Sequence, residues 1–226
     1  MSLLSWNHSD EAIQIVTDTL SSNMDGTAAH FQTKCWALPH LRLVMAGTGS
    51  AELLERWHEN LQQWMLIRDI TMLNKHAPTA LRRVWREHVL ASPRLPPGAK
   101  PTATVYHFGH DEETGALVQY AYRSTADFKG EFRPGPAFAV KPQPDFAFEP
   151  PTDIEQWVEL CKQLREQDDA LPLGEGVGIG GELILTTIQD SMLMQVPLFR
   201  WPDYDDMWNE MNERAFEAQM VEAAED

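Results

Sequence analysis

The pattern of apolar and polar positions predicts short strands near both ends of the chain. Ala12–Leu20 is apolar and β-branched, which predicts a strand, and two more strands are predicted around Thr33–Leu38 and Leu41–Ala46. Late in the chain, Leu183–Ile188 and Met192–Phe199 flank a polar turn. These two segments therefore predict a hairpin.

Helical periodicity appears between these groups of strands. A helix is predicted from Ala51 to about Leu73, where apolar side chains recur at steps of four, four and three and Ser50 is placed to cap the first turn. A second helix is predicted over Pro78–Leu90, with the proline near its first turn. Thr152-Asp-Ile-Glu155 has the pattern of a capping box and predicts the start of a third helix.

The middle of the chain predicts a second hairpin and two irregular segments. Ala103–Phe108 and Ala116–Arg123 are the strands of this hairpin. His107 and His110 lie at its turn, where we interpret them as part of a solvated tip rather than as metal ligands, because no third ligand is predicted. The proline-rich stretch from 133 to 151 and the glycine-rich stretch from 174 to 181 are predicted loops.

The order of these elements predicts an α+β fold with antiparallel sheets. Strands joined by hairpins pair antiparallel, and helices that arrive in blocks can cover both outer faces of a two-sheet sandwich. A doubly wound α/β fold is disfavoured because strands and helices do not alternate. We expect one domain over residues 1–202 and an acidic C-terminal helix over 203–226.

Composition limits the partners and the compartment. The 226 residues carry a formal charge of −16, from 34 acidic and 18 basic side chains, which disfavours nucleic acid as a partner. No apolar run is long enough to span a membrane, and the first residues lack the features of a signal peptide. We therefore expect a cytoplasmic protein in which Cys35 and Cys161 are buried thiols, with no cysteine zinc site.

Three residues near the start have a characteristic spacing. If Met1 is removed, Ser2 becomes the N-terminal residue; Asp18 follows it by sixteen positions, and Lys34 follows Asp18 by sixteen more. This spacing resembles that of proteasome β subunits, which are N-terminal-nucleophile hydrolases. The apolar segment Leu43–Gly49, and the glycine pair and strand over residues 180–187, resemble later landmarks of that family.

The resemblance implies a four-layer αββα sandwich and a catalytic site. Ser2 would be the nucleophile, with its own α-amine, of pKa about 8, as the base. Lys34 and Asp18 would activate Ser2, and the Gly47 amide would stabilise the oxyanion. The implied substrate is a peptide or another amide, and no cofactor or metal is implied. The implied assembly is a dimer or ring of identical chains.

Two departures from the family pattern keep an alternative open. The stretch from 137 to 141 lacks a serine that the family uses near its N-terminus, and Ile179 stands where another serine would be expected. The alternative is a catalytically inactive, proteasome-like subunit that acts as an oligomeric scaffold. A small-molecule acylase using the same Ser2 mechanism is a third hypothesis. The acidic tail carries an apolar stripe that could pack on a neighbouring subunit (Met207, Trp208, Met211, Ala215, Phe216 and Met220).

Overall fold

The computed structural model describes residues 3–23, 26–64, 66–93, 95–172, 174–190 and 192–225, with side chains described through residue 217. The strands are β1 (Leu4–His8), β2 (Ala12–Asp18), β3 (Leu20–Ser22), β4 (Ala28–Phe31), β5 (Cys35–Leu38), β6 (Leu43–Gly49), β7 (Ala103–His110), β8 (Leu117–Arg123), β9 (Gly130–Arg133), β10 (Ala137–Lys141), β11 (Glu182–Gln189) and β12 (Met192–Arg200). The helices are α1 (Ala51–Gln63), α2 (Ile70–Val84), α3 (Ile154–Asp169) and α4 (Tyr204–Glu225), and a π-helical turn (Trp85–Leu90) follows α2.

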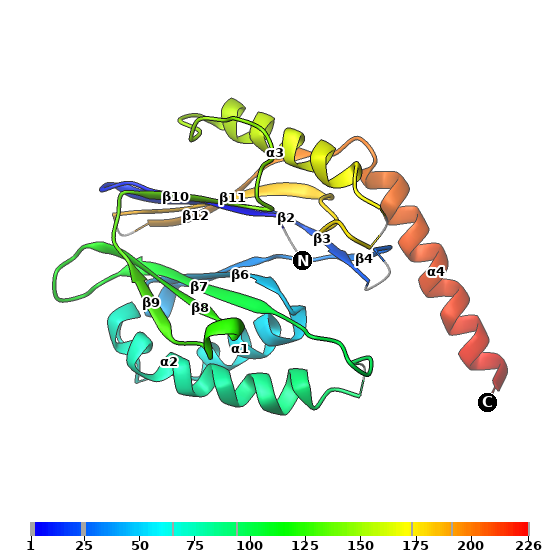
Figure 1. Ribbon diagram of the computed structural model, residues 1–226, viewed down its shortest axis with the longest axis horizontal. Helices are drawn as coiled ribbons and strands as arrows, with labels where there is room; N and C mark the ends of the chain where they lie inside the picture. The colour runs from blue at the N-terminus through cyan, green and yellow to red at the C-terminus, as the bar shows by residue number, and fades with distance from the viewer. Residues whose placement is uncertain are drawn as a thin grey trace.

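The strands form two five-stranded sheets and one small hairpin. The first sheet has the order β10-β1-β2-β11-β12, the second has the order β5-β6-β7-β8-β9, and β3 pairs with β4. Every pairing is antiparallel. The predicted α+β class with antiparallel sheets is therefore confirmed. In Figure 1 the two sheets lie face to face, with α3 outside the first sheet and α1 and α2 outside the second.

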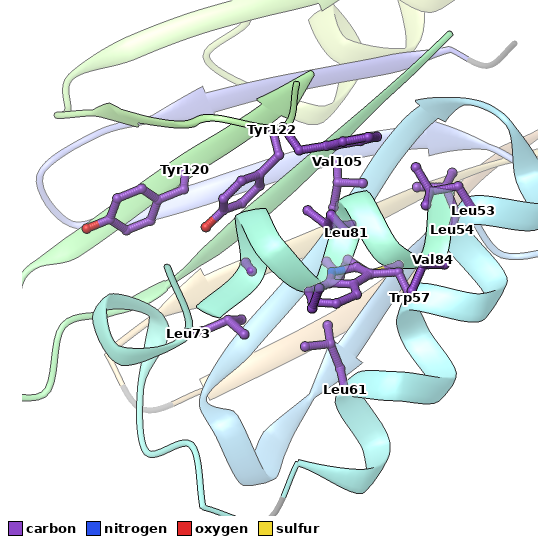
Figure 2. Packing of buried hydrophobic residues seen from close by; sticks show 14 of the residues in the cluster. Leu53, Leu54, Trp57, Leu61, Leu73, Leu81, Val84, Val105, Tyr120 and Tyr122 are labelled. Carbon is purple, nitrogen blue, oxygen red and sulfur yellow. The ribbon is translucent and has the colours of Figure 1, made fainter. Parts of the chain in front are cut away.

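Three hydrophobic clusters hold these elements together. One lies between α1, α2 and the second sheet, where Trp57, Leu81 and Tyr122 are fully or almost fully buried (Figure 2). Another packs α3 on the first sheet around Trp157. The third contains residues of both sheets, among them Trp6 on β1 and Phe108 on β7. Burial of these apolar side chains is the main stabilising contribution.

The prediction of one helix from Ala51 to about Leu73 is wrong, because this segment contains α1 and the beginning of α2. Ser50 caps α1 as predicted, accepting a hydrogen bond from the Leu53 amide at 3.3 Å. Asp69 caps α2 by accepting a hydrogen bond from the Met72 amide at 2.7 Å. A second helix therefore begins there, although the continuous periodicity had predicted a single helix. Pro78 then lies inside α2 rather than at the start of a helix.

Several short elements also differ from the sequence predictions. The cap of α3 is Asp153, which accepts from the Gln156 amide at 2.8 Å, not the predicted Thr152. β6 continues through Gly49, where the sequence predicted a turn after Ala46. The strands β1, β3, β4, β9 and β10 were not predicted; each is only three to five residues long. Among the described residues, no helix is long and apolar enough to cross a membrane.

His107 lies in the core rather than at a solvated hairpin tip, so that interpretation of the residue is wrong. It sits within β7, fully buried, and its Nε2 accepts a hydrogen bond from Trp57 Nε1 at 2.9 Å. Its Nδ1 has no hydrogen-bond partner among the described residues. Burial lowers the pKa of His107 from 6.5 to about 3.

This burial predicts a loss of stability at acid pH. Because the pKa of His107 is about 3 when folded, against 6.5 as its ordinary value, only the unfolded chain binds its proton between these two values. The stabilisation is therefore complete above pH 6.5 and is lost as the pH falls toward 3. His107→Gln keeps an acceptor for Trp57 but does not titrate. Between pH 6.5 and 4.5, the free energy of unfolding of this variant should therefore fall by about 2 kcal/mol less than that of the wild type.

Urea unfolding of both proteins across this pH range measures the difference. Parallel pH profiles for the wild type and for His107→Gln would contradict a buried neutral imidazole.

Candidate functional site

A buried ion pair joins Asp18 and Lys34. Asp18 is the last residue of β2 and is 0% exposed, and Lys34 immediately precedes β5 and is 3% exposed. Lys34 Nζ lies 2.6 Å from Asp18 Oδ1 and also donates to the carbonyl of Leu20. The two residues, separated by sixteen positions in the sequence, are thus brought into direct contact. The pair also connects the first sheet, through β2, to the second sheet, through β5.

Two backbone amides complete the surroundings of the Asp18 carboxylate. The Leu3 amide donates to Oδ1 at 3.1 Å, and the Gly180 amide donates to Oδ2 at 3.2 Å. Both oxygens are therefore hydrogen-bonded, as a buried carboxylate requires. These bonds fix the start of the chain and the loop before β11 against the same side chain.

Burial disfavours the charged form of both residues and therefore shifts their pKa values in opposite directions. It raises the pKa of Asp18, although the charge and hydrogen bond of Lys34 and the amides of Gly180 and Leu3 oppose that change. It lowers the pKa of Lys34, against the effect of Asp18. A lysine whose pKa is lowered exchanges a proton more readily near neutral pH than an exposed one.

Ser2, predicted as the nucleophile, lies outside the described residues. Its neighbour Leu3 is fully buried, and the Leu3 amide binds Asp18 as described above. The first described residue is therefore held at the ion pair.

The register of β5 and β6 relates Gly47 to Lys34. Cys35, which follows Lys34, pairs with Ala46, which precedes Gly47, at the end of this antiparallel ladder. A Cβ at Gly47 would lie 2.8 Å from the Thr104 carbonyl oxygen and 2.3 Å from Leu54 Cδ2. Close packing alone thus favours glycine at this position, whether or not its amide has a chemical role.

Asp168 is a further site residue whose position the sequence did not reveal. It lies near the end of α3, is 6% exposed, and accepts from the amides of Val177 at 2.7 Å and Gly178 at 2.9 Å. These bonds hold the loop that carries the Gly180 amide to Asp18. The sequence signal was an acidic residue ahead of a glycine-rich loop, which alone does not indicate which backbone groups it binds.

Cys161 lies beneath the same site. The thiol is fully buried, and burial raises its pKa, with the nearby Asp18 charge adding to the increase. It is therefore a protonated core residue rather than a reactive thiolate. Among the described residues, no group of three or more His, Cys, Asp or Glu side chains could hold a metal ion.

A cavity of about 470 Å³ adjoins Lys34. Its wall includes Ser21, Gln32, Trp36 and Leu54, from the segments that flank the ion pair and from α1. The volume falls within the range of roughly 300 to 1,000 Å³ that is typical of small-ligand pockets. The lining combines apolar, hydroxyl and charged groups, among them Lys34 and Glu55.

The paired antiparallel sheets, the helices outside them and the buried Asp18–Lys34 pair together define an α+β protein with a buried ion pair between its two sheets. The sequence matches no protein-family model and no curated protein sequence.

Solved structures of Anbu proteins are similar to this chain over almost its whole length. Anbu from Pseudomonas aeruginosa, described as a helical assembly, is 13% identical with a TM-score of 0.62, covering 99% of this chain and 95% of the other. A Gly-1 mutant of Anbu from Hyphomicrobium sp. strain MC1 is 9% identical with a TM-score of 0.60, covering 99% and 97%. Anbu from Yersinia bercovieri, described as an ancestral beta-subunit, is 11% identical with a TM-score of 0.59, covering 96% of each chain.

These similarities correct the resemblance drawn from the sequence. The identification with proteasome β-subunit hydrolases is wrong, because the similar structures are Anbu proteins, a proteasome-like but distinct family. The spacing of Ser2, Asp18 and Lys34 could not make this distinction. It reflects where β2 ends and β5 begins, which is a property of the fold. At 9–13% identity the likeness establishes the fold alone.

The buried pair predicts a strong, non-additive effect on stability. Asp18→Asn leaves Lys34 buried without its counter-charge, and Lys34→Met leaves the carboxylate without its cation. Each should lower the free energy of unfolding by about 3 to 5 kcal/mol. The double variant buries no charge, so its loss should be smaller than the sum of the two single losses.

Urea unfolding of the four proteins closes this cycle. Additive single losses would show that the two side chains are not energetically coupled and would contradict the described contact.

Proposed function

We propose that this chain is a proteasome-like subunit that self-associates into an ordered oligomer. The observation that carries the proposal is α4, the 22-residue helix Tyr204–Glu225. Its first half contacts β4 as far as Arg214, and its second half runs away from the two sheets and lies beside no other element (Figure 1). A helix placed in this way is suited to contact a second copy of the chain.

The start of α4 is fixed firmly to its own subunit. Tyr204 stacks on Phe31 of β4 with ring centroids 4.5 Å apart, and Trp208 follows at 6.3 Å. Arg165 of α3 forms an ion pair with Asp203, just before the helix. These contacts give α4 a set direction relative to the sheets, which a specific assembly requires.

The exposed side of α4 carries two large apolar side chains. Phe216 is 64% exposed, and Trp208 is 50% exposed despite its contact with Phe31. Acidic residues surround them, among them Asp205, Asp206 and Glu210. Large exposed aromatic side chains within a polar surround are typical of protein–protein contacts.

Two further observations support the proposal. The structure from Pseudomonas aeruginosa, similar in fold, is described as a helical assembly. The three hydrophobic clusters support the four-layer αββα order of proteasome-like subunits, with helices outside each sheet. We include this layer order in the proposal, together with the division into a body over 1–202 and the C-terminal helix as the subunit contact.

Phe216→Glu should weaken self-association without unfolding the subunit. The exposed ring makes no aromatic contact within the chain among those described, whereas a buried aromatic at a subunit contact is often worth 2 kcal/mol or more. We expect the concentration at half-assembly to rise by about tenfold or more, as measured by sedimentation velocity.

Leu66→Glu is the matched control. Leu66 is 86% exposed and lies between α1 and α2, away from α4, so its replacement introduces the same charge elsewhere. Equal sedimentation of Phe216→Glu and the wild type would remove α4 from the contact.

A second candidate function is amide-bond hydrolysis at the Asp18–Lys34 site. The specific observation that favours it is a buried lysine, with its pKa lowered by burial, whose partner carboxylate also holds the Leu3 amide. With Met1 removed, Ser2 would supply the hydroxyl nucleophile and its own amine as base. Gly47 would offer an oxyanion donor, and the cavity beside Lys34 would take a side chain of a peptide or other amide substrate.

Covalent labelling tests this candidate without requiring a known substrate. Intact-mass spectrometry should first show that Met1 is absent. A peptide epoxyketone or β-lactone should then add once per chain at Ser2, and Ser2→Ala should take up none. Lys34→Met should reduce labelling by about a hundredfold, within the range attributed to general acid–base groups. Lys75→Met, an exposed position on α2, should label normally.

Retention of Met1, or absence of labelling on a verified free Ser2, would rule out hydrolysis at this site. Neither result would affect the proposed self-association, which depends on α4.

A further inference from the structure

A second cavity, of about 560 Å³, is lined by strands of both sheets. Trp6 on β1 and the end of β10 contribute from the first sheet. Thr48 on β6, Thr104 and Tyr106 on β7, and the ends of β8 and β9 contribute from the second. The cavity therefore lies where the two sheets meet, and its shape is set by the body of the fold rather than by a single loop.

Three cationic side chains line this cavity, and the described lining contains no acidic residue. Arg123, Arg133 and Lys141 are the last residues of β8, β9 and β10 respectively. The whole chain has only 18 basic residues and a net charge of −16. The wall of this cavity is thus positively charged, whereas the molecule as a whole is strongly negative.

The nearby acidic partner neutralises only part of this charge. Glu131 forms an ion pair with Arg123 and lies 3.7 Å from Arg133, so one carboxylate serves both guanidinium groups. Lys141 Nζ has a hydroxyl partner, Thr48 Oγ1 at 3.4 Å, and lies 5.5 Å from the Tyr106 ring centroid. No carboxylate contacts Lys141 among the described residues. The cluster retains a formal charge of +2.

We infer that this cavity binds an oxyanion, either a carboxylate or a phosphate group. Guanidinium groups bind such anions through paired N–H donors, and an ammonium adds a third point of charge. The hydroxyls of Thr48 and Thr104 are further hydrogen-bonding groups on the wall. Like charges held close together repel, and a bound anion would relieve that repulsion.

The anion site lies beside the candidate site and is separate from it. Gly49, at the end of β6, lines both cavities, whereas Lys34 lines only the other one. A ligand bound here would therefore lie in an adjoining cavity that Lys34 does not line. The inference depends on neither proposed function, because it requires neither a free Ser2 nor an assembled oligomer.

Isothermal titration calorimetry with two simple anions tests the inference on the full chain. Sodium phosphate and sodium succinate are titrated separately in chloride buffer of matched ionic strength. We expect one saturable site per chain for at least one anion. Tighter binding of phosphate would identify a phosphorylated ligand, and tighter binding of succinate would identify a carboxylate such as an acidic peptide side chain.

Variants locate the binding. Arg133→Gln and Lys141→Met should each weaken binding by about tenfold or more, because each removes a charged hydrogen-bond donor. Lys141→Arg should bind the anion as the wild type does, because it keeps the positive charge. Arg56→Gln, which removes an exposed arginine paired with Glu59 on α1, should bind as the wild type does.

Arg133 is 42% exposed in its side chain, so its replacement can be tested even if Lys141→Met fails to fold. Saturable binding of neither anion, or equal binding by Arg133→Gln and Arg56→Gln, would overturn the inference.

Discussion

The buried contact between Lys34 and Asp18 is the interaction on which the arrangement of this molecule depends. It joins the end of β2 in one sheet to the start of β5 in the other, and the same carboxylate binds the Leu3 and Gly180 amides. Removing one partner from such a buried pair is far more costly than removing an exposed one, because an uncompensated charge is left behind. Four separate segments of the chain are thus fixed by one carboxylate.

The geometry around this pair explains why two cavities meet at the same end of the sandwich. Asp168 holds the loop that delivers Gly180, so α3 takes part in the site without contacting Lys34. The last residue of β6, Gly49, lines both the cavity beside Lys34 and the cationic cavity near Lys141. The fold therefore places the buried Asp18–Lys34 pair and the two cavities close to the C-terminal end of β6. The helix α4 begins next to β4, and its Met207 packs against Gly180, whose amide binds Asp18.

Much of this arrangement could be predicted from the sequence, and the failures have physical causes. The regular spacing of Asp18 and Lys34 correctly indicated a contact, because strand ends and their register fix which residues meet. Short strands such as β1 and β10 were missed, since pairing rather than local propensity makes them strands. Continuous periodicity concealed the Asp69 cap that divides α1 from α2, and His107 was misplaced because a polar residue on a strand gives no signal of burial. The distinction between proteasome β subunits and Anbu proteins could not follow from spacing that the shared fold imposes.

The proposed assembly of the chain with copies of itself can be tested by native mass spectrometry of the 226-residue protein. A single chain has a mass of 25.7 kDa. We expect species at defined multiples of that mass, which dissociate to single chains on dilution. A lone 25.7 kDa species at every concentration, from a protein that unfolds cooperatively in urea, would contradict it.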